Sequence, residues 1–288
     1  MSTFPYREVD VFTREPLLGN PVAVVHDAVG PDDDRMAAFA RWTNLSETTF
    51  LLPPTPEGAA AGADYRLRIF TPGGELPFAG HPTLGSCHAW LEAGGTPRGG
   101  DVVVQECALG LVTLRRTGDA LAFAAPALLA DEPLEPVTLD AFVTALDIPA
   151  DAVVDHRLLD NGPGWRVLLL DSAERVLALD PDWSGVDSSV HRAIGVVGPT
   201  GATDPDAPAF EVRGFVPGIS VPEDPVTGSL NAVIGQWLTS TGRAPDRYVA
   251  RQGTALGRDG RVHVSRDADG AVWVGGGTVT CVSGTVRL

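Results

Sequence analysis

The amino-acid sequence predicts an α+β protein made of two pseudo-symmetric lobes, each a β-sheet or barrel wrapped around a central helix. Two observations lead to this prediction. A segment of the first half is repeated in the second half, and short strand-like segments outnumber helical ones along the 288 residues. A chain of this length can bury a core either in one large domain or in two lobes of about 140 residues each.

The repeat relates "DYRLRIFTPGGELPFAGHPTLGSCHAWLEAGG" to "AFEVRGFVPGISVPEDPVTGSLNAVIGQWLTSTG". Matches at a constant offset of 145 residues begin at Tyr65 and end at Pro77. After a shift of two residues, an offset of 143 places His81 opposite Asp224. Repetition at half the chain length favours two similar lobes over a single one.

Strands are predicted where apolar and polar residues alternate, or where short apolar runs lie between turn residues. These segments are residues 7–13, 21–27, 48–53, 65–70, 101–106, 111–116, 166–171, 210–215, 261–266, 272–276 and 285–288. In each copy of the repeat a helix follows, from near Thr83 to Gly94-Gly95 and from near Thr227 to Gly242, because glycine suits the left-handed cap that ends a helix. Weaker helical patterns cover 32–42 and 139–146, and the segment 125–137, rich in Ala and Pro, is the predicted junction between lobes.

Composition and charge exclude several classes of protein. Hydrophobic residues make up 44% and charged residues 20%, which is typical of a globular chain. The formal net charge of -16 and the lack of a basic stretch argue against nucleic-acid binding. We expect a cytoplasmic protein, because the N-terminus does not read as a signal peptide and no apolar run approaches the ~20 residues of a membrane helix. Three widely spaced cysteines suit neither a disulfide framework nor a zinc site.

The two predicted helix starts are candidate anion sites, because the first N–H groups of a helix lack internal partners and the dipole makes that end positive. If the lobes face each other, residues 83–86 and Thr227-Gly228-Ser229 could direct amides at one small carboxylate. The alternative is that these hydroxyls only cap their helices. His81 and Asp224 are expected immediately before the helix starts, where they could hold an amine or hydroxyl of a substrate or act as ordinary cap and loop residues.

Glu47 is the candidate acid-base residue, since it directly precedes the apolar segment 48–53. Partial burial there would raise the pKa of its carboxyl group toward neutrality and suit it to proton transfer. The alternative is a surface glutamate at the start of a strand. The position 145 residues later lies near Arg192, where no carboxylate occurs, so only one lobe carries this candidate.

Together these motifs resemble the phenazine-biosynthesis PhzF-like family, which shares the diaminopimelate epimerase fold. The resemblance covers nearly the whole chain, through "VDVFTREPLLGNPVAVV", "NLSETTF", "RIFTPGGELPFAGHPTLG", "RGFVPGISVPEDPVTGS", "RQGTALGRDGRVHV" and "VWVGGGTVTCVSGTVRL". It implies an N-terminal lobe at 1–130, a C-terminal lobe at 131–274, and a C-terminal strand at 275–288 that returns to the first lobe. It also implies an active site in the cleft between lobes, often in a homodimer.

The resemblance further implies an isomerase that moves a hydrogen along a conjugated system without a metal or organic cofactor. The family's acid-base glutamate corresponds to Glu47, and its substrate-binding residues correspond to Gly80, His81, Asp224 and Ser229; Gly228 joins them as an amide donor. Glu223 is expected to be structural. This chain has Leu230-Asn231 where the family often has Ala-His, which puts the identity of the substrate in doubt.

Three hypotheses follow from the sequence. The first is a cofactor-independent isomerase of a small unsaturated, cyclic amino or carboxylic acid in secondary metabolism, such as antibiotic or phenazine-type biosynthesis. The second is a racemase or tautomerase of an amino-acid derivative. The epimerase relatives use two facing cysteines, whereas Cys87 is predicted to lie in the core. The third is a non-catalytic protein that binds small anions.

Overall fold

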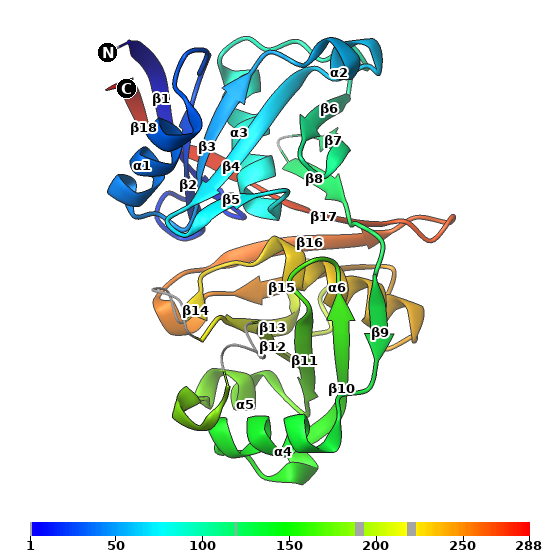
Figure 1. The fold of residues 1–288 in the computed structure, drawn as a ribbon. Coiled ribbons are helices and arrows are strands. Elements are labelled where there is room, and N and C mark those ends of the chain that lie inside the picture. Colours follow the sequence, from blue (N-terminus) through cyan, green and yellow to red (C-terminus); the bar gives the residue numbers. More distant parts are fainter. Residues whose placement is uncertain (1, 119, 188–192, 218–222) are drawn as a thin grey trace. The chain divides into compact units, whose positions relative to one another are not determined.

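The computed structural model describes residues 2–118, 120–187, 193–217 and 223–288 (Figure 1). Arg192, which entered the comparison of the two lobes with Glu47, lies outside these ranges. The chain forms two compact units, Met1–Ala124 together with Gly275–Leu288, and Ala125–Val274. We call them unit 1 and unit 2 and describe each by itself.

Unit 1 is mostly β-structure with three helices among its described residues. Its strands are β1 (Thr3–Val11), β2 (Asn20–Val25), β3 (Thr48–Leu52), β4 (Tyr65–Thr71), β5 (Gly74–Leu76), β6 (Val102–Cys107), β7 (Gly110–Thr117), β8 (Ala120–Ala124) and β18 (Thr278–Arg287). Its helices are α1 (Asp33–Thr43), α2 (Pro56–Ala60) and α3 (Gly80–Glu92). β18 pairs antiparallel with β1, so the first and last strands of the chain lie side by side in this unit (Figure 1).

Unit 2 repeats this arrangement. Its strands are β9 (Ala130–Glu132), β10 (Val153–Asp160), β11 (Trp165–Leu170), β12 (Ile194–Pro199), β13 (Pro208–Phe215), β14 (Glu223–Asp224), β15 (Arg247–Gln252) and β16 (Gly260–Arg266). Its helices are α4 (Pro136–Ala145), α5 (Ala173–Ala178) and α6 (Gly228–Ser240), with short 3₁₀ turns at Ala150–Ala152, Trp183–Gly185 and Thr254–Leu256. β17 (Val272–Gly276) contains the point at which the chain passes from unit 2 back to unit 1.

The pairing of strands is the same in both units. β1–β2 and β10–β11 are antiparallel, β2–β3 and β11–β12 are parallel, and β3–β4 and β12–β13 are antiparallel. β4 then pairs parallel with β6 and antiparallel with β5, as β13 does with β15 and β14. In each unit the strand pair β4–β5 or β13–β14 leads directly into a 13-residue helix, α3 or α6. The predicted α+β class and internal repeat are therefore confirmed.

Helices α3 and α6 are central because almost every side chain of their first two turns is buried. α3 contacts β1, β2, β3, β4, β8 and β18. Close packing is possible where glycine replaces a side chain: a Cβ at Gly85 would overlap Val22. On another side of unit 1, α1 packs Phe39 edge-on against Phe50 and stacks it on Trp42, at centroid distances of 6.4 and 6.0 Å.

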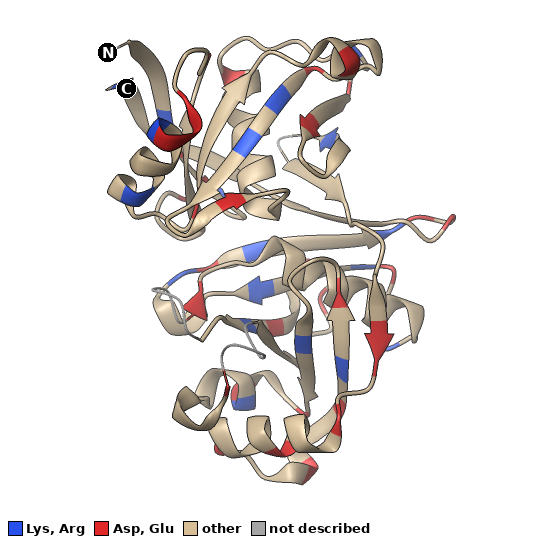
Figure 2. Cartoon of the chain, viewed as in Figure 1, with Lys and Arg blue, Asp and Glu red and all other residues tan. Residues whose placement is uncertain are grey.

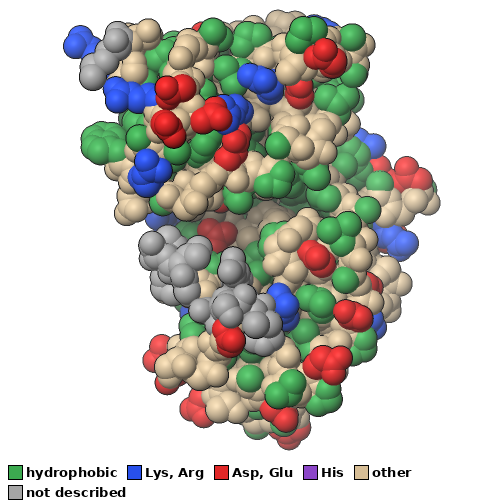
Figure 3. Space-filling model, in the orientation of Figure 1, with side chains coloured by type: hydrophobic (Ala, Val, Ile, Leu, Met, Phe, Trp, Pro, Cys, Tyr) green, Lys and Arg blue, Asp and Glu red, His purple; other side chains and the backbone are tan. Residues whose placement is uncertain are grey.

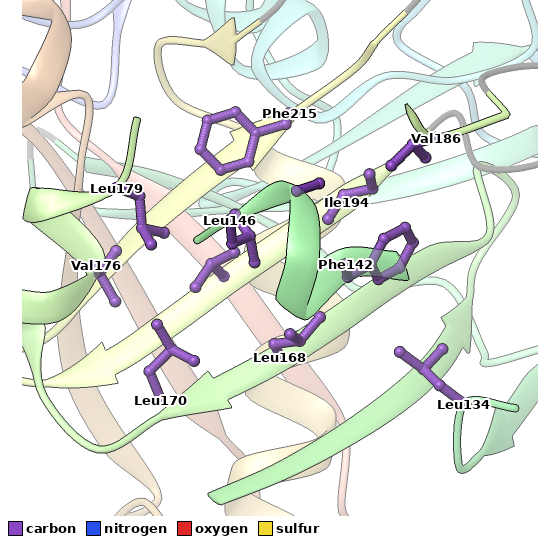
Figure 4. Packing of buried hydrophobic residues seen from close by; sticks show 12 residues of the cluster. Leu134, Phe142, Leu146, Leu168, Leu170, Val176, Leu179, Val186, Ile194 and Phe215 are labelled. Atoms are coloured by element: carbon purple, nitrogen blue, oxygen red, sulfur yellow. The ribbon is translucent and has the colours of Figure 1, made fainter. Parts of the chain in front are cut away.

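The apolar core shown in Figure 4 belongs to unit 2 and lies between α4, α5 and strands β11 and β12. Phe142 of α4 and Leu168 of β11 are fully buried in it. α4 begins at Pro136, three residues before the predicted 139, because a proline at the first helical position needs no N–H partner. Burying an aromatic or aliphatic side chain of this kind contributes roughly 1.5–3 kcal/mol.

A buried ion pair connects two segments of unit 2. Arg213 of β13 donates from Nε and Nη2 to the carboxylate of Glu223 at 2.9 and 2.7 Å, and from Nη1 to the carbonyl oxygen of Leu179 at 2.6 Å. The two side chains are only 6% and 10% exposed. Glu223 is the residue before Asp224, so this pair fixes the short strand β14 on which Asp224 lies.

Charged residues of both signs are interspersed within each unit (Figure 2). In unit 1, Arg68 of β4 pairs with Asp33 of α1 and with Glu75 of β5, and blue and red side chains gather over these elements in Figure 3. Among the described residues, no helix is both long and apolar enough to cross a membrane.

Candidate functional site

Glu47 and His81 lie together in unit 1. Glu47 directly precedes β3, and His81 is the second residue of α3. Oε2 of Glu47 is 3.2 Å from Nε2 of His81, and the two side chains are 15% and 5% exposed. The structure therefore pairs the two candidate residues of this unit, with Gly80 adjacent at the start of the helix.

Asn20, which the sequence did not single out, fixes the orientation of His81. It is the first residue of β2, is 1% exposed, and has Nδ2 3.3 Å from Nδ1 of His81. An amide nitrogen only donates, so Nδ1 accepts and the proton of the neutral ring lies on Nε2, facing Glu47. Asn20 follows Gly19, whose N–H donates to the buried carboxylate of Asp10 at 3.0 Å. The Gly-Asn-Pro turn before an apolar strand was the only sequence signal for this support.

Burial raises the pKa of Glu47 to about 7, because its carboxylate is taken out of water next to an apolar strand. A group with this pKa is close to half-ionised at neutral pH. It can therefore accept a proton from a weak carbon acid and return it, which is the requirement for a single acid-base residue.

The same shift predicts how stability depends on pH. Below about pH 4.5 the carboxyl group is protonated in both folded and unfolded states. Between about 4.5 and 7 only the unfolded state loses its proton, so folding weakens as pH rises, by about 3 kcal/mol in full. Glu47→Gln is expected to remove this penalty: in urea unfolding it gains about 3 kcal/mol at pH 8 and little at pH 4.5. The control Glu132→Gln, at an exposed position of β9, is expected to leave the free energy of unfolding unchanged at both pH values. A gain there equal to that of Glu47→Gln would contradict the prediction.

Asp224 belongs to a closed hydrogen-bond network in unit 2. The hydroxyl of Thr227 donates to Oδ2 of Asp224 at 2.6 Å and accepts from Nε2 of Gln252 at 2.9 Å. Thr227 is the N-cap of α6 by position, yet its side chain makes no capping hydrogen bond to the helix. The predicted alternative that Thr227 only caps the helix is therefore wrong, because Asp224 and Gln252 compete for its hydroxyl.

Gly228 and Ser229 form the start of α6. The first N–H that bonds within the helix is that of Asn231, to the carbonyl oxygen of Thr227 at 3.0 Å, so the amides of 228–230 precede the helical hydrogen bonds. The hydroxyl oxygen of Ser229 accepts from Nε1 of Trp165 at 3.2 Å. Since an indole N–H can only donate, the hydroxyl proton of Ser229 is left to donate elsewhere, as an anion site requires.

Leu230 and Asn231 point into unit 2, and both are fully buried. A Cβ on Gly195 or Gly214 would meet the methyl groups of Leu230, so glycines on β12 and β13 make room for this side chain. Nδ2 of Asn231 donates to Oε1 of Gln252 at 2.8 Å. The departure from Ala-His is thus accommodated inside the unit.

The start of α3 differs from the prediction. The helix begins at Gly80, not near Thr83, because Pro82 lies in the first turn, where a missing N–H costs nothing. His81 is therefore inside the helix, whereas Asp224 lies four residues before α6, and the two positions are not equivalent. The amide of Thr83 bonds to the carbonyl oxygen of Ala79, so residues 83–86 cannot offer amides to an anion.

Comparisons with known proteins decide the family. A model of the phenazine biosynthesis-like proteins, PhzC-PhzF, matches residues 9–284. The chain belongs to the PhzF family.

Relatives and solved structures cover the whole chain. A Schizosaccharomyces pombe protein named antisense-enhancing sequence 1 is 38% identical over 99% of both chains. The trans-2,3-dihydro-3-hydroxyanthranilate isomerase of Pseudomonas aeruginosa is 31% identical over 98% of this chain and 99% of its own. The Bacillus anthracis PhzF-family structure superposes with a TM-score of 0.84 at 21% identity, over 100% of both chains. These findings confirm the predicted PhzF-like isomerase family and its diaminopimelate epimerase-like fold.

The cysteines of this PhzF-family chain do not suit a two-thiol mechanism. Cys87 is fully buried, and burial raises the pKa of its thiol to about 12. The sequence places all three cysteines outside residues 125–274, so unit 2 has none. Within the described ranges, no group of three or more His, Cys, Asp and Glu side chains is arranged to hold a metal ion.

Proposed function

We propose that this PhzF-family protein is an isomerase that moves a hydrogen, together with a double bond, within a small unsaturated cyclic amino or carboxylic acid. Glu47 removes a proton from one carbon, and the electrons of the broken C–H bond shift the double bond. The protonated Glu47 then delivers the proton to another carbon of the same conjugated system. Glu47 is ionised again at the end of the cycle, and substrate and product contain the same atoms.

The observation that supports this proposal is the geometry of Glu47. Its pKa of about 7 allows both removal and return of the proton, and 15% of its side chain remains exposed. Oε2 of Glu47 lies 3.2 Å from Nε2 of His81, so the ring stands beside the carboxylate. Positioning of this kind raises the rate of proton transfer by fixing the reacting groups.

The binding residues are assigned by their chemistry. Asp224 accepts from an amine or hydroxyl of the substrate, while the amide of Gly228 and the hydroxyl of Ser229 donate to its carboxylate. Gly80 and His81 are assigned as further substrate-binding residues, through their backbone N–H groups at the start of α3. The substrate is proposed only as a class, because one full-length relative is named for an isomerase of dihydro-hydroxyanthranilate and a more identical one for no reaction.

The test is incubation with trans-2,3-dihydro-3-hydroxyanthranilate, and with a panel of cyclic dienyl and enamine carboxylates, in deuterated buffer followed by NMR. We expect one substrate to shift its double bond, with deuterium at the carbon that receives the proton wherever Glu47 exchanges with solvent. Deuterium at a stereocentre without a shifted double bond would identify a racemase instead. Binding that survives Glu47→Gln, with no turnover by the parent, would identify a non-catalytic anion-binding protein.

Three further expectations stay predictions. They are a cytoplasmic location, assembly as a homodimer, and a role in antibiotic or phenazine-type biosynthesis.

A further inference from the structure

Gln252 ends strand β15 and is fully buried beside the start of α6. Its side-chain amide makes four hydrogen bonds. Oε1 accepts from the backbone N–H of Thr227 at 3.0 Å and from Nδ2 of Asn231 at 2.8 Å. Nε2 donates to the carbonyl oxygen of Asp224 at 3.1 Å and to the hydroxyl of Thr227 at 2.9 Å. This amide therefore uses its full hydrogen-bonding capacity.

The direction of every hydrogen bond in this network is determined. The backbone N–H of Thr227 can only donate, so Oε1 of Gln252 must face it. The carbonyl oxygen of Asp224 can only accept, so Nε2 must face that side. Nε2 then donates to the hydroxyl of Thr227 as well, and the hydroxyl proton is left to point at Oδ2 of Asp224, 2.6 Å away.

Two glycines permit this close arrangement. A Cβ at Gly214 of β13 would lie 2.9 Å from the Thr227 hydroxyl and 3.3 Å from Nε2 of Gln252. Gly253 has φ of +95°, and a Cβ there would lie 2.7 Å from the carbonyl oxygen of Pro225. Each neighbour would have to shift if either position carried a side chain.

We infer that Gln252 is a positioning residue for substrate binding: by donating to Thr227 it turns the threonine hydroxyl toward Asp224 and fixes the carboxylate that binds the substrate. This inference rests on the proposed function, in which Asp224 is a substrate ligand. Gln252 itself is buried and acts only through Thr227 and the backbone of Asp224.

The decisive variant is Gln252→Glu. A glutamate keeps an oxygen for the N–H of Thr227 and for Asn231, but it cannot make both donations of Nε2: the ionised form donates to neither Thr227 nor the backbone of Asp224, and the protonated form has a single O–H. If Gln252 only supported the helix start through Oε1, substrate binding would survive. We expect KM to rise at least about tenfold while kcat changes less than about threefold, which is the pattern of lost substrate binding without loss of the base.

Thr227→Val tests the same pathway. It removes the hydroxyl while keeping the shape of the side chain, and we expect a similar rise in KM. Because both changes interrupt one pathway, the double variant is expected to be no worse than the more impaired single variant. Gln236→Leu is the matched control: this half-buried glutamine of α6 donates to the carbonyl oxygen of Pro126, and we expect its KM to equal that of the parent.

The outcomes separate the inference from the proposed function. If the parent turns over a substrate and Gln252→Glu retains its KM, the inference is wrong and the proposed function stands. If the parent turns over no member of the panel, the proposed function is wrong. A crystal structure of Gln252→Glu then decides the inference without activity: a Thr227 Oγ1 to Asp224 Oδ2 distance kept near 2.6 Å overturns it, and loss of that hydrogen bond supports it.

Discussion

Glu47→Gln is expected to lower kcat by about 10²- to 10⁴-fold, the range typical of losing a positioned general acid-base. The amide keeps the size of the side chain and places a neutral oxygen or nitrogen beside Nε2 of His81, so substrate binding is expected to change little. The measurement is steady-state kinetics on the substrate found in the deuterium experiment. A variant that retained the parent's kcat would show that another group transfers the proton.

The pH profile provides an independent check of the same residue. Proton removal requires the ionised form of Glu47, so kcat/KM of the parent is expected to rise about tenfold per pH unit below 7 and to level off above it. The residual activity of Glu47→Gln is expected to lose this rise. If the variant kept the same inflection near pH 7, the titrating group would be a different one.

Reactivity and stability oppose each other at Glu47. The burial that brings its pKa to about 7 is also what makes its ionised form costly in the folded state. One substitution should therefore remove activity and add stability at alkaline pH. Such a combined result is expected of a catalytic group and not of a surface glutamate.

The repeat and the alternating patterns were sufficient for the α+β class and the two similar units, but not for every element: strands β8, β10, β12 and β15 and helices α2 and α5 were not predicted. The start of α3 was a further error. Pro82 and Gly80 read as turn residues in isolation, yet the first helical turn tolerates both. No local pattern distinguishes a glycine that precedes a helix from one that opens it.

The supporting residues of the site could not be predicted in the same way. Glu47 stood out because its type and position suggest chemistry, whereas Asn20 and Gln252 are ordinary polar residues at strand ends. Their importance arises from contacts across 61 residues to His81 and across 25 residues to Thr227. Only the tertiary fold creates these pairs, so a single sequence carries no signal for them.

Glu223→Gln is expected to destabilise the protein by about 3–5 kcal/mol. Its carboxylate and Arg213 are almost fully buried, and an amide would leave the guanidinium charge without a counter-charge in a low-dielectric interior. Chemical unfolding at pH 7 measures the loss. Asp171→Asn is the control, because Asp171 and Arg175 form a solvent-exposed ion pair in the same unit, and little or no loss of stability is expected there.

The source of this destabilisation can be separated from loss of packing. Replacing both members, as Arg213→Met with Glu223→Met, removes the unpaired charge and is expected to recover most of the stability, since apolar residues of similar volume often replace a buried pair without loss. Because Glu223 holds β14 next to Asp224, the recovered double variant is still expected to bind substrate more weakly than the parent. Equal stability of Glu223→Gln and the parent would show that the pair does not hold this strand.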